Sequence, residues 1–305
     1  LKKLFELNNK KNKLNINDLG YLIGPILNAG GRLGKSKFAS ELLSSNKIQI
    51  IDEKSQELIK LNNKRKKFET LTLNEIDFKK IEEENKDIIV YYNSNINEGL
   101  IGIIASRLKD HFNKPSIVIT HSNNMLKGSA RSVSNYNIGR VIKNSLDAKI
   151  LVSGGGHSAA AGFTLHKANL STFENFILKD YLNTGLFRSN IFSYDAEVSS
   201  LAFNIDFYND IKKLEPFGTG NPSPTFLLRD LKTIKATILD NKHVSVLLKS
   251  KSGFLINSIS FNSINNQIGE YLLNYKNTLN VLGQINENIW NNKKKLQLTI
   301  RDIVI

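Results

Sequence analysis

The sequence predicts two parts of different fold class: an α/β domain preceded by a long connector helix, and an all-β barrel after it. Strands alternate with helices between residues 85 and 185, a charged stretch with almost no Gly or Pro precedes them, and β-rich runs replace the helices from about residue 190. A length of 305 residues is more than one ordinary core needs and also favours about two domains.

The first part, residues 1–84, is predicted to be a helical connector. One short helix runs into Gly24 and Pro25, and a second covers residues 36–45. Residues 51–84 are dense in charge and carry only a sparse apolar stripe at helical spacing. So thin a stripe predicts a long helix that packs one face against a neighbour.

The middle of the chain has the pattern of a sheet covered by helices. Buried-strand runs and apolar residues at a helical period alternate along it. The predicted strands are residues 87–92, 116–120 and 149–152, and the predicted helices are residues 100–112, 137–145 and 170–182.

The last part, residues 190–305, is predicted to be all-β. Its β-rich runs are residues 194–201, 226–239, 242–249, 253–261 and 278–304, the last broken by a hairpin at 291–292. Five to six strands in about 110 residues fit an oligonucleotide-binding (OB) barrel. A generic small barrel or sandwich fits the same pattern equally well.

The chain is strongly basic, with 42 Lys and Arg against 28 Asp and Glu, a formal net charge of +14. An excess of this size favours a polyanionic partner, because each neutralised phosphate releases counterions. The alternative is that the positive charge reflects codon usage alone, since a very AT-rich genome encodes proteins with abundant Lys, Asn and Ile.

Composition also excludes several classes of protein. The absence of Cys excludes disulfide scaffolds, zinc–cysteine and iron–sulfur centres and thiol nucleophiles. No apolar run approaches the roughly 20 residues of a membrane span, and no signal peptide opens the sequence. We therefore expect a soluble, cytoplasmic protein.

The most distinctive segment is residues 154–162, in which three glycines precede His157. Glycines expose backbone N–H groups, and a glycine turn that opens a helix forms an anion site. His157 there can donate to a phosphate or act beside a reacting group. The alternative is a tight turn whose histidine satisfies the local backbone.

Residues 128–132 place Arg131 between Ser129 and Ser132. A planar guanidinium flanked by hydroxyls suits bidentate binding of a phosphate. A surface arginine in a loop is the alternative. In residues 24–33, small residues surround Asn28 and Arg32, which makes Arg32 a further candidate. The alternative for this segment is a turn that connects two helices.

Two features of the β region have structural explanations. Residues 215–224 are dense in turn residues and predict a fixed loop before the next strand. Four aromatic residues could stack on bases, but aromatic side chains in a barrel more often form the core. They are Tyr208, Phe226, Phe254 and Trp290.

Together these segments resemble the RecJ family of bacterial single-strand-specific exonucleases. Residues 154–162 alone are typical of the wider DHH/DHHA1 phosphoesterase superfamily, and residues 215–224 before a β barrel narrow the resemblance to RecJ. The matching segments occur in the family's order: residues 24–33, 64–66, 99–108, 128–132, 154–162 and 215–224.

The resemblance implies a DHHA1 domain at residues 85–185 and an OB domain at residues 190–305. It implies 5′→3′ removal of nucleotides from single-stranded DNA, in DNA repair and recombination, with Mn²⁺ or Mg²⁺ as cofactor. It further implies a monomer that binds single-stranded DNA and no membrane, with a single-strand-binding protein or a helicase as candidate partners.

The resemblance also implies roles for individual residues. It assigns catalysis to His157. It assigns the binding of substrate phosphates to five residues, which are Arg32, Ser129, Arg131, Gly155 and Gly156.

The sequence departs from the family in three respects. The metal-binding half, with its Asp-His-His signature, has no counterpart in this chain, which begins at Leu1. Its metal ligands are therefore expected in a preceding domain, with none in this chain, and this chain alone is expected to be inactive. Ile26 stands where the family usually has Arg, and Asn97 where it has His.

Two other functions stay open. A non-catalytic protein that binds single strands would show steep salt dependence without metal-dependent cleavage. A small-nucleotide phosphodiesterase of the same superfamily would prefer dinucleotides to long strands, but such enzymes usually lack a barrel after the DHHA1 domain.

Overall fold

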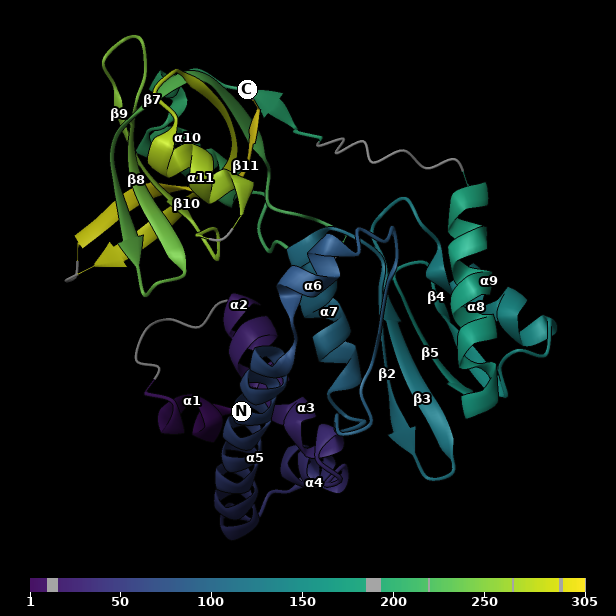
Figure 1. Cartoon of the computed structure of the whole chain (residues 1–305). Coiled ribbons are helices and arrows are strands. Elements are labelled where there is room, and N and C mark those ends of the chain that lie inside the picture. The colour runs from purple at the N-terminus through teal and green to yellow at the C-terminus, as the bar shows by residue number, and fades with distance from the viewer. Residues whose placement is uncertain (10–15, 185–192, 219, 265, 291–292, 305) are drawn as a thin grey trace. The chain divides into compact units, whose positions relative to one another are not determined.

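The computed structural model describes residues 1–9, 16–184, 193–218, 220–264, 266–290 and 293–304. The chain forms two compact units, Leu1–Arg188 and Ser189–Ile305. Each unit has its own hydrophobic core, and Figure 1 draws the elements of both. No helix in the described ranges is long and apolar enough to span a membrane.

The first unit begins with helices that pack around one small core. Apolar side chains of five of its helices, including Leu4, Ile23, Ile26, Leu42 and Leu58, are buried together. The helices are α1 (Lys2–Leu7), α2 (Ile16–Asp18), the π-helix η1 (Leu19–Ile23), α3 (Gly24–Arg32), α4 (Lys37–Ser44), α5 (Ile48–Glu75) and α6 (Phe78–Glu83).

The predicted long connector is two helices rather than one. The α5 helix ends at Glu75. The next residue, Ile76, adopts an extended conformation and is 5 % exposed, and after it the chain turns into α6. The buried face of α5 is mostly polar, because Asn62, Arg65 and Glu69 lie on it beside Leu58. This explains why the apolar stripe in the sequence is so sparse.

A five-stranded sheet forms the centre of the first unit, in the order β1-β2-β3-β5-β4. The β1–β2 pair is parallel and the other pairs are antiparallel. The strands are β1 (Ile89–Tyr92), β2 (Ser116–Ser122), β3 (Met125–Arg131), β4 (Ser153–His157) and β5 (Ala160–Leu165).

Helices cover the two faces of this sheet unequally (Figure 1). On one face, α7 (Ile101–Phe112) packs against β2 and β3. On the other, α8 (Ile138–Asp147) and α9 (Leu170–Asn183), which the 3₁₀ turn η2 (Lys167–Asn169) precedes, close a core around Phe163 and Phe173. Hence β4 and β5 lie beyond the strands that α7 contacts.

Two local predictions in this region are wrong. Residues 154–157 continue strand β4 instead of opening a helix, and strand β3, which includes most of residues 128–132, was not predicted. The strand expected at 149–152 begins only at Ser153, because Lys149 takes a left-handed φ of 58° after α8. Glycine suits β4, since a Cβ at Gly154 would lie 2.9 Å from Ile142 of α8.

The second unit is a closed barrel, because β10 pairs with β7 as well as β11. Alternate residues of its strands, such as Val244, Val246 and Leu248, fill the interior. The strands are β6 (Ala196–Glu197), β7 (Phe226–Leu239), β8 (His243–Lys249), β9 (Leu255–Ser260), β10 (Leu279–Trp290) and β11 (Lys293–Val304).

Most of the predicted β runs match these strands. The run at 194–201 does not, because only the short β6 forms there before the 3₁₀ turn η3 (Ser200–Ala202). Two helices, α10 (Ile205–Lys212) and α11 (Gln267–Asn274), were not predicted. In the loop before β7, the Asn221 side chain donates to the carbonyls of Leu214 and Pro216 at 2.9 and 3.0 Å.

Candidate phosphate-binding site

Arg32 lies where the helical segment meets the first turn of α7. It is the last residue of α3, and its Nη1 donates to the Gly99 carbonyl at 3.0 Å. The backbone of Arg32 leaves no room for a side chain at Gly99. Asn97 contributes here too, because its Oδ1 accepts a hydrogen bond from the Gly99 N–H at 2.9 Å.

Arg131 and Ser129 reach the same turn of α7 from β3. Arg131 Nη1 donates to Ser129 Oγ at 3.0 Å and to the Ala130 carbonyl at 2.8 Å. A Cβ at Gly102 would lie 2.8 Å from Arg131 Nη2 and 3.0 Å from Ser129 Oγ. Gly102 is therefore the residue that lets both side chains lie against the helix.

The two site arginines lie in an unfavourable electrostatic environment. Burial and the charge of Arg32 lower the pKa of Arg131 below its ordinary value. Burial and the charge of Arg65 lower the pKa of Arg32, against an opposing effect of Glu69. Among the described residues, neither Arg32 nor Arg131 forms an ion pair with a carboxylate. Such a cluster favours binding of an anion with several oxygens.

Glu69 is already engaged by other arginines. Its carboxylate accepts from Arg65 Nη1 at 2.7 Å and from Arg107 Nε at 2.8 Å, which ties α5 to α7. Arg65 also donates to Asn62 at 3.1 Å. Sequence reasoning missed this network, although the spacing of Asn62, Arg65 and Glu69 on one helix face was a usable signal.

His157 lies on the same face of the sheet as Arg131. It is the last residue of β4 and is exposed, and its Nδ1 accepts from the Ala159 N–H at 3.3 Å. Ala160 of β5 is opposite both His157 and Arg131 in the register. Opposite residues project from the same face, and with strands about 4.8 Å apart the two backbones are roughly 10 Å apart.

Between His157 and Arg131 the sheet carries only the methyl group of Ala160, and the neighbouring row of the same face contains two glycines. Gly162 is opposite both Ser129 and Gly155 in the register. A Cβ at Gly155 would meet no atom within 4 Å, and one at Gly162 would meet only the Gly128 carbonyl at 3.9 Å. The result is an open strip of sheet with a histidine at one end and an arginine at the other.

Gly156 differs from Gly155, with which the sequence grouped it. A Cβ at Gly156 would collide with Ala160 and Ala161 of the neighbouring strand. Glycine is therefore required at this position for β4 and β5 to pair. Since β4 is an edge strand, alternate backbone N–H groups along it have no partner strand.

Several residues considered from the sequence lie away from this surface. Ser132, the second hydroxyl beside Arg131, is 7 % exposed and donates to the Tyr136 carbonyl at 2.7 Å. Ile26 is 1 % exposed in the core of the helical segment, so its position cannot contact a phosphate.

The aromatic residues of the second unit belong mostly to its core. Phe226 is 5 % exposed, and Tyr208 and Phe254 are partly buried against the same cluster. The side chain of Trp290 lies outside the described part of the structure.

The described residues do not supply a metal site. No group of three or more His, Asp or Glu side chains within the described ranges could hold an ion. The described residues therefore do not fit Mn²⁺ or Mg²⁺, and the groups that this surface offers are guanidinium, hydroxyl and imidazole groups.

Both units match known domain families. The DHHA1 domain family matches residues 85–181, and the RecJ OB domain family matches residues 194–302. The residue bounds predicted above for the three parts of the chain are not tested by these matches and stay predictions.

Two relatives align with most of this chain. The chain is 32 % identical to the single-stranded-DNA-specific exonuclease RecJ of Haemophilus influenzae, over 80 % of this chain and 45 % of that protein. It is 29 % identical to RecJ of Bacillus subtilis, over 94 % of this chain and 37 % of that protein. The chain thus spans about half the length, or less, of these relatives.

A solved structure has the same fold. The crystal structure of RecJ from Thermus thermophilus in complex with Mn²⁺ aligns with a TM-score of 0.81 and 22 % sequence identity, over 100 % of this chain and 43 % of that one. A second structure of the same protein, in complex with Mg²⁺, aligns with a TM-score of 0.78.

Proposed function

This chain is RecJ-like, with a DHHA1 domain followed by a RecJ OB domain, and on that basis we propose that it is the substrate-binding part of a 5′→3′ exonuclease specific for single-stranded DNA. One observation carries the proposal. Two half-buried arginines, Arg32 and Arg131, both have a lowered pKa and pair with no described carboxylate, beside an open strip of sheet.

A terminal phosphate satisfies this arrangement. Its negative oxygens accept from the guanidinium groups of Arg32 and Arg131, and the Ser129 hydroxyl donates to the same group. Binding of the phosphate relieves the repulsion between the two arginines. His157, at the other end of the strip, donates a hydrogen bond to the next phosphate of the strand.

The bare strip suits a substrate whose sequence varies. The surface around Gly155 and Gly162 offers room and no side-chain donors or acceptors to read a base. Contacts of the strand with Arg131 and His157 at the two ends involve phosphates alone. This supports binding that depends on the backbone and is insensitive to sequence.

The second unit supports binding of a longer strand. OB barrels bind oligonucleotides on an outer face. Exposed lysines on β7 and β8 supply positive charge there, and they include Lys232, Lys235 and Lys249. Binding by such a surface depends on phosphates and falls steeply with salt.

We further propose that hydrolysis uses Mn²⁺ or Mg²⁺, the ions named with the Thermus thermophilus structures. An ion of this kind supplies charge stabilisation at the scissile phosphate. The resemblance implies that residues of a preceding domain, and none of this chain, would hold it. Action in repair and recombination, a monomeric state and recruitment by a single-strand-binding protein or a helicase stay predictions of the resemblance. A cytoplasmic location stays a prediction of the composition.

A nuclease assay separates the candidate functions. The chain and any longer product of its reading frame are incubated with single-stranded, duplex and dinucleotide substrates, with Mn²⁺ or with chelator. The proposal expects metal-dependent cleavage of single strands from the 5′ end by the longer product. Binding without cleavage by every product supports the non-catalytic alternative, and preference for dinucleotides supports the phosphodiesterase.

A further inference from the structure

One short segment joins the two ends of the phosphate-binding strip. It begins directly after Arg131 and ends at the start of α8. Its first residue, Ser132, donates its N–H to the Ala159 carbonyl at 2.9 Å, and Ile138 donates its N–H to the Ser158 carbonyl at 3.1 Å. The segment therefore holds the turn that follows His157.

The first turn of α8 also contacts His157 directly. A Cβ at Gly139 would lie 2.7 Å from the His157 carbonyl oxygen, so α8 packs tightly against this part of the backbone. Any movement of the segment 132–138 or of the start of α8 would displace His157. The same movement would act on Arg131, because the chain runs directly from it into the segment.

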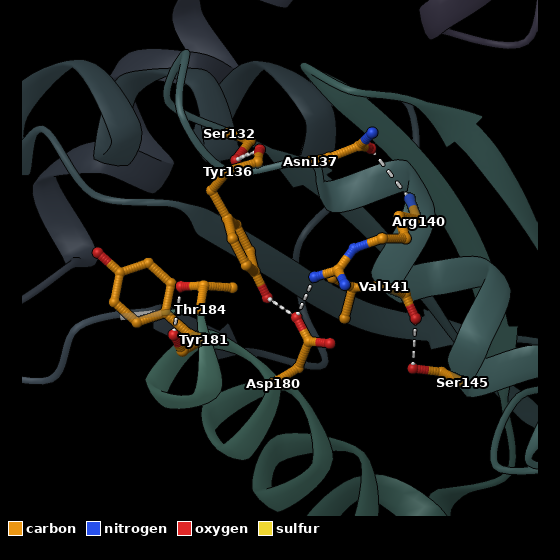
Figure 2. Close-up of polar contacts among 9 residues, drawn as sticks. All are labelled: Ser132, Tyr136, Asn137, Arg140, Val141, Ser145, Asp180, Tyr181 and Thr184. Atoms are coloured by element: carbon orange, nitrogen blue, oxygen red, sulfur yellow. Dashed lines mark hydrogen bonds and ion pairs between the residues drawn. The ribbon is translucent and has the colours of Figure 1, made fainter. Parts of the chain in front are cut away.

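A single carboxylate fixes this segment from α9, as Figure 2 shows. Asp180 Oδ2 accepts from the Tyr136 hydroxyl at 3.1 Å and from Arg140 Nη2 at 2.8 Å. Tyr136 belongs to the segment, and Arg140 lies in the first turn of α8, whose N-terminus Asn137 caps at 3.0 Å. Asp180 therefore anchors both elements that contact the His157 turn.

Tyr136 and Arg140 both need the hydrogen-bond acceptor that Asp180 provides. Tyr136 is 1 % exposed, and its ring packs edge-on against Tyr181 with centroids 5.0 Å apart. Burial and the Asp180 carboxylate raise the pKa of Tyr136 well above its ordinary value, so its hydroxyl stays a donor. Without Asp180, a buried hydroxyl and a guanidinium would both lose their acceptor.

We propose that Asp180, through Tyr136 and Arg140, is a positioning residue that sets the location of His157 relative to Arg131. Asp180 touches neither of them and is not itself a catalytic residue. The inference rests on the proposed function, because it presumes that the strip between His157 and Arg131 holds the substrate phosphates.

Four variants of the whole chain test it. Asp180→Ala removes the acceptor, and Asp180→Asn keeps one oxygen that can accept from both donors but removes the negative charge. Tyr136→Phe deletes a single hydroxyl. Ser145→Ala is the matched control. Ser145 is fully buried in α8, the helix of Arg140, and its hydroxyl donates to the Val141 carbonyl at 2.9 Å, away from the His157 turn.

The readout is the ring signal of His157 in ¹H–¹³C NMR spectra, assigned with His157→Ala. Each variant is titrated with a short oligothymidylate that carries a 5′ phosphate, and circular dichroism verifies folding. We expect Asp180→Ala to move the unliganded His157 signal and to weaken binding about tenfold, as small misplacements of binding groups do. Asp180→Asn should recover part of that loss, and Ser145→Ala should bind like the wild type.

The outcomes separate the inference from the function on which it rests. If the chemical shift of the wild-type His157 ring does not change when the oligonucleotide is added, the proposed function is wrong. If the wild type responds and Asp180→Ala responds equally, the positioning role is wrong. Should Asp180→Ala fail to fold, Tyr136→Phe decides: a displaced His157 signal with weaker binding supports the role, and behaviour like Ser145→Ala overturns it.

Discussion

Gly155 and Gly156 are neighbours in β4, yet a methyl group added to each would meet different surroundings. At Gly155 it would project into open space over the strip, and at Gly156 it would collide with β5. We expect Gly155→Ala to leave the unfolding midpoint in urea nearly unchanged and to weaken single-strand binding. Gly156→Ala should cost about 2–3 kcal/mol of stability by overpacking. Equal loss of stability in both would contradict this placement.

His157 is expected to act on turnover more than on affinity. It is exposed at the end of the strip, whereas in the proposed function many basic side chains of this chain, whose net charge is +14, hold a long strand. In the nuclease-active protein, His157→Ala should lower kcat by about 100-fold or more, in the range of a lost general acid–base group. KM for a long strand should change little. Intact turnover would make His157 a structural residue.

The sequence nominates candidate site residues, but it does not show which of them lie together. Arg32, Ser129 and Arg131 are predicted as phosphate ligands from residue type and resemblance, and the structure brings them together at the start of α7. The different surroundings of Gly155 and Gly156 follow from strand register, and the anchoring of the segment 132–138 depends on Asp180, more than 40 residues away in the chain.

At the scale of elements, the contact between α5 and α7 depends on Glu69. This residue is 7 % exposed and pairs with Arg65 and Arg107. Glu69→Gln should destabilise the first unit by about 3 kcal/mol, because it leaves a buried guanidinium without its counter-charge. Urea unfolding monitored by circular dichroism measures the loss.

A matched control for this variant is Glu84→Ala. Glu84 pairs with Lys86 at 2.9 Å, and both side chains are largely exposed. Exposed pairs contribute about 0–1 kcal/mol, so the midpoint should barely move. If Glu69→Gln behaves like Glu84→Ala, the buried network does not hold α5 against α7.

Hydrophobic periodicity predicted most elements, and two of the missed strands contain glycine and serine. The helices α7, α8 and α9 and the strands β7 and β8 lie close to the expected positions, because their apolar residues follow one clear period. The strands β3 and β4 were missed, since Gly and Ser resemble turn residues when the strand that packs beside them is unknown.

At the scale of the whole molecule, two units share one basic chain with a net charge of +14. If the barrel binds the strand through phosphates, replacing exposed lysines should act uniformly on all sequences. In the whole chain, Lys235→Gln with Lys249→Gln should weaken single-strand binding and lower the slope of log K against log salt by roughly 1–2. Fluorescence anisotropy at several salt concentrations measures this slope.

The control for the lysine variants lies in the first unit. Lys79 of α6 is also exposed, and Lys79→Gln changes the net charge without touching the barrel or the strip. It should leave the salt slope within experimental error. A slope that falls equally in both variants would mean that net charge, and no particular surface, governs binding.

Binding of a terminal phosphate between Arg32 and Arg131 is tested most directly by comparing a short oligothymidylate with and without a 5′ phosphate. The wild-type chain should bind the phosphorylated strand more tightly, and Arg131→Gln should remove that preference with a loss of about 10- to 100-fold, the effect of one charged hydrogen bond. Equal binding of both strands by the wild type, unchanged in Arg131→Gln, would contradict a phosphate site on this face of the sheet.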